Sequence, residues 1–113
     1  MSKVLILDYQ VRAVPFEWQA ELKRQGHDVN KYQRYGNFTE TGGQISRYNV
    51  VFASQNNGNL AKLVEDAEAS GIKVYLFNGV APEVADKVRG SKNISLLEGV
   101  PNLDKILELV GRG

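Results

Sequence analysis

The stretch YNVVFASQNNGNL, residues 48–60, is the part of the chain that decides the fold. An apolar run ends in four polar residues and a glycine, and a pattern with helical period begins directly afterwards. This order predicts a strand, a tight polar turn and a helix N-terminus, which is where open α/β sheets bind ligands. The stretch therefore predicts both a fold class and the place of a site.

Strand-like and helix-like segments alternate on both sides of this stretch. Strands are expected at residues 4–7, 28–32, 48–53, 73–77 and 94–97. Helices are expected from Pro15 to Gly26, from Asn57 to Gly71, from Pro82 to Gly90 and over 103–110. Residues 33–47 have little apolar periodicity, so we expect a loop there, with at most a short helix near 43–47.

Repeated strand–helix units imply right-handed crossovers and a mostly parallel sheet. The sequence thus predicts one three-layer α/β domain over residues 1–113, with five strands in the flavodoxin-like order 2-1-3-4-5. The strand at 28–32 is short and polar, which places it at an edge of the sheet.

Composition excludes several classes of function. The 113 residues carry a net charge of +1 without a basic tail or stripe, so nucleic-acid binding is not expected. The chain has no cysteine and one histidine, so neither a disulfide nor a metal site is expected, and no cofactor is signalled. No apolar run is long enough to cross a membrane, and the first residues lack a secretory h-region. These features favour a cytoplasmic protein.

In the expected strand order, ligands bind outside the carboxyl ends of strands 1 and 3, where the crossovers reverse direction. The polar residues at those ends, with one more after strand 4, are the candidate ligand-binding set: Asp8, Tyr9, Ser54, Gln55, Asn56, Asn57, Gly58 and Asn78. Backbone N–H groups at the helix start near Asn57 would favour an anion such as phosphate. No catalytic residue is assigned.

A turn without any ligand explains the same residues equally well. Asn and Gly are the residues that a strand-to-helix turn uses for capping and for positive φ, and Asp8 can also cap a neighbouring turn. Other candidates have simpler roles: His27 as a turn residue, Glu65 on a solvated helix face and Trp18 in the core. The aromatic and basic residues between Tyr32 and Phe38 could stack on a base, but a packed loop explains them better.

A response-regulator receiver has the same expected order of elements. It needs an acidic pair after strand 1, an Asp at the end of strand 3, Ser or Thr at strand 4 and Lys at strand 5. The matching positions here are Asp8-Tyr9, Ser54, Asn78 and Glu98. Only Asp8 fits, so phosphoacceptor chemistry is not expected and the resemblance implies a degenerate receiver. Neither GxGxxG nor GxxxxGK[ST] occurs, so neither dinucleotide nor Walker-type binding is signalled.

A second resemblance covers about residues 50–77. The run VVFAS, the amide turn, Gly58 and then AEASGIKV at 67–74 follow one another as strand, turn, helix and strand. This segment resembles the SLOG and nucleoside-deoxyribosyltransferase-like group of Rossmann-type domains, and GHDV at 26–29 is similar to their entry to strand 2. The resemblance implies a nucleotide-like ligand at residues 54–58. The G-x-G-T motif and helix Glu of the enzymatic members have no clear counterpart, which weakens the case for catalysis.

Three hypotheses follow. The first is a domain that binds a small polar or nucleotide-like ligand at the switch-point crevice, with Asp8 orienting a hydroxyl or base edge. The second is a non-catalytic protein-interaction or regulatory module, either a degenerate receiver or an accessory protein, that acts through a helix face or through residues 33–47. The third is a hydrolase or transferase, which would need an acid–base partner such as Glu65 or Glu98 beside Asp8.

Overall fold

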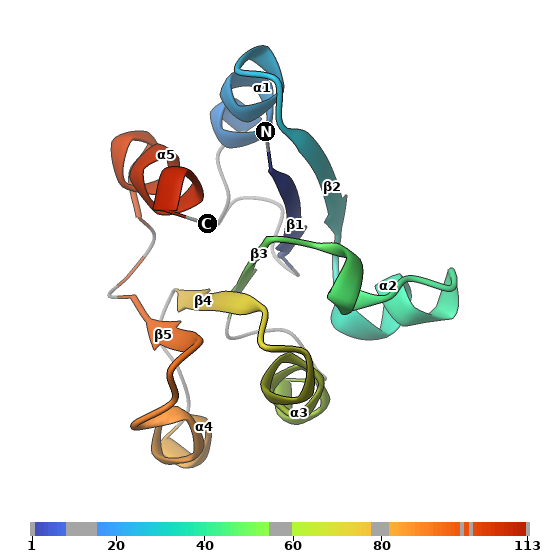
Figure 1. Cartoon of the computed structure of the whole chain (residues 1–113), viewed down its shortest axis with the longest axis vertical. Coiled ribbons are helices and arrows are strands. Elements are labelled where there is room, and N and C mark those ends of the chain that lie inside the picture. Colours follow the sequence, from blue (N-terminus) through green and yellow to red (C-terminus); the bar gives the residue numbers. More distant parts are fainter. Residues whose placement is uncertain are drawn as a thin grey trace.

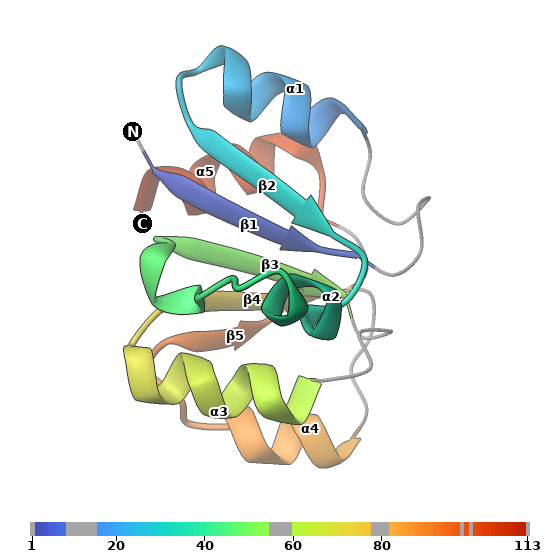
Figure 2. The same ribbon diagram turned by 90° about the vertical axis from the view of Figure 1, so that its right-hand side faces the viewer.

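The protein folds around one five-stranded sheet in which every pairing is parallel. The computed structural model describes residues 2–8, 16–54, 60–77, 82–97, 99 and 101–112. The strands are β1 (Lys3–Leu7), β2 (Asp28–Tyr32), β3 (Val50–Ser54), β4 (Lys73–Phe77) and β5 (Ile94–Leu96). Their order is β2-β1-β3-β4-β5, and all of them point the same way (Figure 2). The predicted fold class, strand order and edge position of residues 28–32 are confirmed.

Helices cover both faces of the sheet and make three layers (Figure 1). They are α1 (Phe16–Arg24), α2 (Tyr35–Glu40), the 3-10 helix η1 (Ile45–Arg47), α3 (Leu60–Ser70), α4 (Pro82–Val88) and α5 (Leu103–Arg112). We call the side covered by α1 and α5 the α1 face, and the side covered by α2, η1, α3 and α4 the α3 face. Within the described residues, no helix is long and apolar enough to cross a membrane.

Each face has its own hydrophobic core because side chains alternate along a strand. On β3, Val50 and Phe52 enter the core of the α1 face, whereas Val51 and Ala53 enter that of the α3 face. Both sets are fully buried, as expected for a parallel sheet covered on two sides. This explains why the strands read as continuous apolar runs rather than as alternating ones.

The segment 33–47 is more ordered than the sequence predicts. The 3-10 helix lies where a short helix was expected, but the prediction of a loop over residues 35–40 is wrong, because α2 occupies them. Tyr35 and Phe38, one helical turn apart, are both buried, and the Phe38 ring contacts the rings of Tyr32 and Tyr48 at 5.3 and 5.6 Å between centroids. Packing of aromatic rings therefore stabilises a helix that lacks an apolar periodicity of its own. The same packing favours the packed interpretation over base stacking.

Gly43 allows the turn after α2 to pack closely against the Phe38 ring. A Cβ at this position would lie 2.4 Å from the Phe38 ring, which is closer than side-chain atoms can approach. The backbone of the turn between α2 and η1 therefore rests directly on that ring. A glycine that the sequence presents as a sign of a loose loop is in fact a packing requirement.

Asn93 joins the end of α3 to the start of β5. Its side-chain amide donates to the carbonyl oxygens of Ala67 at 3.0 Å and Ile72 at 2.8 Å. Its backbone N–H and that of Ile94 donate to the Ser91 hydroxyl. The two bonds from the side-chain amide provide donors for carbonyl groups where α3 ends and the chain turns into β4.

Candidate functional site

Asp8 and Ser54 lie next to each other at the carboxyl ends of the two central strands. The register pairs Leu7 of β1 with Ala53 of β3, and Asp8 and Ser54 are the next residues on each strand. The Asp8 backbone N–H donates to the carbonyl of Tyr32 at 3.0 Å, which continues the parallel ladder beyond β1. Neighbouring strands run about 5 Å apart, so the two residues are adjacent. Both are buried, and apart from tryptophan and tyrosines they are the only buried residues with a polar side chain in the described part of the chain.

Alternation along the strands places both side chains on the α1 face. Val4 and Ile6 point to that face from β1, and Val50 and Phe52 point to it from β3. Asp8 and Ser54 continue these two series with the same two-residue step. Phe77 of β4, which pairs with Ser54 of β3, lies in the core of the same face. The carboxyl edge of the α1 face therefore carries a carboxyl group, a hydroxyl group and an aromatic ring side by side.

Two buried polar atoms on this face have no hydrogen-bond partner in the described structure. They are the Ser54 hydroxyl oxygen and the Trp18 indole nitrogen Nε1. Ser54 is 1% exposed and Trp18 is fully buried. A buried hydroxyl or N–H without a partner costs about 1–3 kcal/mol, so folded proteins contain few of them. Two such atoms on one face need an explanation.

The Trp18 ring lies against the residues that flank Ser54. Its centroid is 5.7 Å from that of Phe77 and 6.3 Å from that of Phe52, and both contacts are edge-on. Trp18 belongs to the first turn of α1. The Trp18 ring therefore packs against the strand residues that neighbour Ser54, beneath the carboxyl edge.

The structure brings together part of the predicted site. Asp8 and Ser54 lie side by side, as the strand order predicts, although Ser54 is the last residue of β3 rather than part of a turn. The other predicted residues lie outside the described part of the chain: Tyr9, Gln55, Asn56, Asn57, Gly58 and Asn78. Trp18 is a core residue, as predicted, but the sequence does not reveal that its indole nitrogen is buried without a partner in the described structure. The signal available was its position in the first turn of a helix that follows strand 1.

The residues considered for catalysis do not gather at this edge. Glu65 is exposed and lines a groove between α3 and α4 on the α3 face, and Glu98 lies outside the described residues. The Nδ1 atom of His27 accepts a hydrogen bond from the backbone N–H of Ser2 at 3.0 Å, at the amino end of the sheet. His27 therefore cannot serve as a base for Ser54. Where the structure describes the chain, no three His, Asp or Glu residues form a metal-binding group.

Two surface cavities lie on the α3 face. One, of about 240 Å³, is open to the surface and bordered by α2, η1 and α3, with Tyr35, Gln44 and Asp66 among its lining residues. The other, of about 400 Å³, lies between α3 and α4 and is lined by Val64 and by charged residues of both signs that include Glu65 and Lys87. The second has the size of a small-molecule pocket, but neither joins the Asp8–Ser54 edge.

Several polar side chains of the α3 face are paired. The Tyr35 hydroxyl donates to Asp66 Oδ2 at 2.5 Å, and Lys62 Nζ lies 3.1 Å from Asp66 Oδ1. The pKa of the Tyr35 hydroxyl is raised above its ordinary value of 10.0. The larger cause is burial of the hydroxyl, and the smaller one is its bond to Asp66. The hydroxyl of Tyr48 donates to Asn30 Oδ1 at 2.8 Å. Hydrogen bonds on this face tie helices to the sheet and to one another.

Comparison with known proteins places the fold. No protein-family model matches the chain, and no curated protein sequence matches it. Among solved structures, a two-component response regulator from Clostridium difficile is similar, with a TM-score of 0.75 and 11% sequence identity over 99% of this chain and 94% of that chain. Nothing in these comparisons supports the resemblance to SLOG domains. The chain has the fold of a response-regulator receiver.

Proposed function

We propose that this protein is a regulatory module that acts through protein contacts and does not accept a phosphoryl group. The observation that carries the proposal is Ser54. In a fold similar to that of a response regulator, the end of β3 carries a buried serine where the receiver pattern has an aspartate. A neutral hydroxyl without a neighbouring base is a weak nucleophile.

The surroundings of Ser54 support the absence of phosphoryl transfer. His27, the only histidine of the chain, is bonded to Ser2 at the opposite end of the sheet. Phosphoryl transfer commonly uses a bound metal ion that neutralises the developing charge. Of the acidic pair that the receiver pattern has after strand 1, only Asp8 is present, because the next residue is Tyr9.

The test of this function combines a phosphodonor with a partner search. Purified protein is incubated with acetyl phosphate and Mg²⁺, and its intact mass is measured. We expect no adduct. Affinity purification from the source cells, with and without acetyl phosphate, should recover the same specific partner in equal amount. A phosphoryl adduct that is lost in Ser54→Ala, or the absence of any partner, would contradict the proposal.

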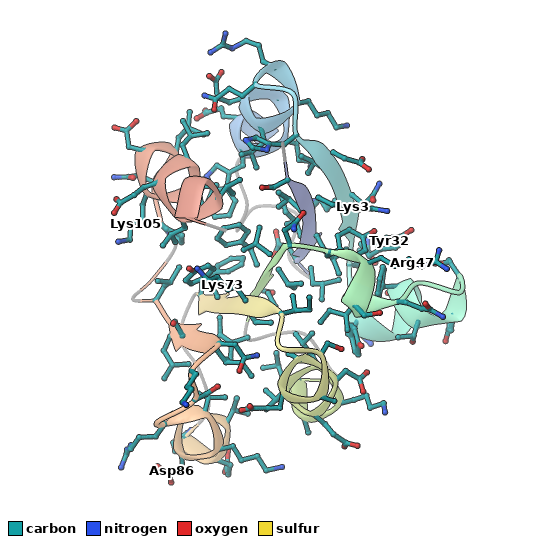
Figure 3. All side chains as sticks on the ribbon, in the orientation of Figure 1. Lys3, Tyr32, Arg47, Lys73, Asp86 and Lys105 are labelled. Carbon is teal, nitrogen blue, oxygen red and sulfur yellow. The ribbon has the colours of Figure 1, made fainter. Side chains whose placement is uncertain are left out.

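Charge reversal can then locate the partner surface. Lys87 of α4 lines the groove on the α3 face, whereas Lys105 of α5 points outward from the α1 face (Figure 3). Both are exposed. Lys87→Glu and Lys105→Glu form a matched pair, because each reverses one surface charge without touching a core. The variant that weakens binding shows which face the partner contacts.

A second function, binding of a small polar or nucleotide-like ligand at the carboxyl edge, is favoured by a different observation. Ser54 and Trp18 each keep a buried polar atom without a hydrogen-bond partner in the described structure. A bound group that pairs with them would remove their cost. Thermal-shift measurements with nucleotides, sugars and phosphates test this, since a ligand that binds the folded form raises the melting temperature. No shift at millimolar concentrations would contradict it.

A further inference from the structure

We propose that the groove between α3 and α4 is the surface at which this protein binds its partner, and that the partner inserts a helix whose apolar stripe is flanked by two basic residues. The assignment rests on the regulatory function proposed above, which acts through protein contacts, and it adds the surface and the chemistry of the partner. The groove is the cavity of about 400 Å³ on the α3 face. Figures 1 and 2 show α3 and α4 side by side at the outer surface of that face.

Part of the groove is apolar. Four of its lining residues follow the spacing i, i+3, i+4 and i+7, which places them on one face of α3: Ala61, Val64, Glu65 and Glu68. Ala61 is exposed and Val64 is 6% exposed, and these two supply the apolar part of the lining. An apolar side chain of a partner gains free energy in such a groove because its surface leaves water.

Unpaired charges border this apolar part. Lys62, which also lines the groove, is paired with Asp66 at 3.1 Å. Glu65 and Glu68 of α3 and Lys87 of α4 are exposed and form no salt bridge within the described residues. The lining therefore presents two unpaired negative charges and one unpaired positive charge. A partner segment with basic residues complements it better than an acidic segment does.

The spacing of the two carboxylates favours a helical partner. Glu65 and Glu68 are three residues apart, which is a rise of about 4.5 Å along α3. Two basic residues three or four positions apart on a second helix have a similar separation. Such a helix can lie along α3 with its apolar stripe in the groove, which is a common way for a protein to bind an amphipathic helix.

A second copy of this chain does not supply this helix. None of the five α-helices that the structure describes carries two basic residues three or four positions apart. The basic residues of α1, Lys23 and Arg24, are adjacent, and Arg24 is bonded to Glu21 of its own helix. The groove therefore fits a different protein.

Helical peptides displayed on phage are the probe for this groove. A library that is randomised on one helix face is selected against the wild-type protein, and the selected peptides are synthesised and measured by calorimetry. We expect these peptides to carry an apolar stripe flanked by two basic residues one helical turn apart. A selection that yields no saturable binder, or only binders with acidic flanks, would overturn the proposal.

Two matched pairs of variants locate the bound peptide. Ala61→Arg places a long side chain in the groove, whereas Ala20→Arg makes the same change at an exposed position of α1. Glu65→Lys reverses a charge of the groove, and Glu17→Lys reverses an exposed charge of α1. We expect the two groove variants to bind the selected peptide at least tenfold more weakly than wild type, and the two α1 variants to bind it equally well. Equal affinities within each pair would place the peptide elsewhere and refute the assignment.

An exchange of charges separates direct contact from the effect of net charge. The selected peptide is resynthesised with glutamate in place of its two basic residues. This peptide should bind Glu65→Lys more tightly than it binds wild type or Glu17→Lys, because opposite charges then face each other again. The same affinity for all three proteins would contradict a contact with Glu65.

The partner recovered by affinity purification separates this assignment from the proposed function. Ala61→Arg should recover at least tenfold less of that partner than wild type, and Ala20→Arg an equal amount. Equal recovery by wild type and Ala61→Arg would keep the proposed function but exclude the groove as its surface. Recovery of no partner would overturn both. A dimer in analytical ultracentrifugation that Ala61→Arg dissociates would assign the groove to a second copy of the chain and overturn the assignment to a different protein.

Discussion

The two faces of the sheet differ in how the polar side chains on them are paired. On the α3 face, Tyr35 is bonded to Asp66, Tyr48 to Asn30, and Asn93 to two backbone carbonyls. On the α1 face, the side-chain polar atoms of Trp18 and Ser54 have no partner within the described residues. The same sheet therefore separates a face on which these polar groups are bonded from a face on which two buried polar atoms have no partner within the described residues.

This difference assigns different roles to the faces. Hydrogen bonds on the α3 face connect α2 with α3 and α3 with β5, so they stabilise the fold. Unpartnered polar atoms on the α1 face lower stability, and they lie at the edge where ligands of parallel sheets bind. Sites that carry function commonly break the rules of stable packing. The predictions below test whether the two faces differ in this way.

The largest effect is expected for Phe38→Ala on the α3 face. Phe38 is 1% exposed and contacts the rings of Tyr32, Tyr35 and Tyr48. Removing a buried phenyl ring should lower the free energy of unfolding by about 4 kcal/mol. Urea denaturation followed by circular dichroism measures this. The control is Asn37→Ala, an exposed neighbour on α2, which should change stability by less than about 0.5 kcal/mol. A loss below about 1 kcal/mol in Phe38→Ala would show that α2 does not depend on this packing.

Asn93→Ala should have the next largest effect. The change removes the two hydrogen bonds that the Asn93 side-chain amide donates to the carbonyl oxygens of Ala67 and Ile72. At about 1 kcal/mol for each lost bond, we expect a loss of about 2 kcal/mol in the free energy of unfolding. Lys92→Ala, an exposed residue next to it, is the control. If the two variants are equally stable, these bonds contribute nothing, and the contrast between the faces is weaker than described.

Tyr35→Phe removes one hydroxyl from the α3 face and should cost about 1.5 kcal/mol at neutral pH, because a bond to a charged group is lost. The effect depends on pH. Burial first, and the bond to Asp66 second, raise the pKa of Tyr35 in the folded protein. Above pH 10 the unfolded chain therefore loses this proton while the folded protein keeps it, which favours unfolding.

The stability advantage of wild type over Tyr35→Phe should consequently be complete below pH 10 and shrink as the pH rises above it. Urea denaturation of both proteins between pH 7 and pH 11 measures the difference. Tyr48, whose pKa is also raised by burial, remains in both proteins and cancels in the comparison. A constant difference across this range would contradict the role assigned to the bond between Tyr35 and Asp66.

The fold was predictable because its signals are local and repeated. Continuous apolar runs such as residues 4–7 and 50–53 predict buried parallel strands. Gly26, Gly71 and Gly90 predict helix ends, and in the structure they adopt the positive φ angles that end helices. The helix α2 was not predictable in this way. Its stability comes from ring contacts between Phe38 and residues on β2 and before β3, which no periodicity within residues 33–47 reveals.

The candidate site was predictable in position and less so in composition. The strand order alone places Asp8 beside Ser54, since β1 and β3 are neighbours and the two residues lie at their carboxyl ends. The contribution of Trp18 could not be derived, because apolar periodicity shows that a tryptophan is buried but not whether its N–H finds a partner. That depends on the side chains of β3 and β4 that surround it.

The smallest effect, and the one with the opposite sign, is expected for Ser54→Ala. Its hydroxyl has no partner in the described structure, so its removal should leave the free energy of unfolding unchanged or raise it by up to about 1 kcal/mol. Ser91→Ala is the matched control, because the Ser91 hydroxyl accepts hydrogen bonds from the backbone N–H groups of Asn93 and Ile94. That variant should lose about 1 kcal/mol. Urea denaturation of both variants compares a paired serine with an unpaired one. If Ser54→Ala loses as much as Ser91→Ala, the Ser54 hydroxyl has a partner in solution, and the α1 face is satisfied like the α3 face.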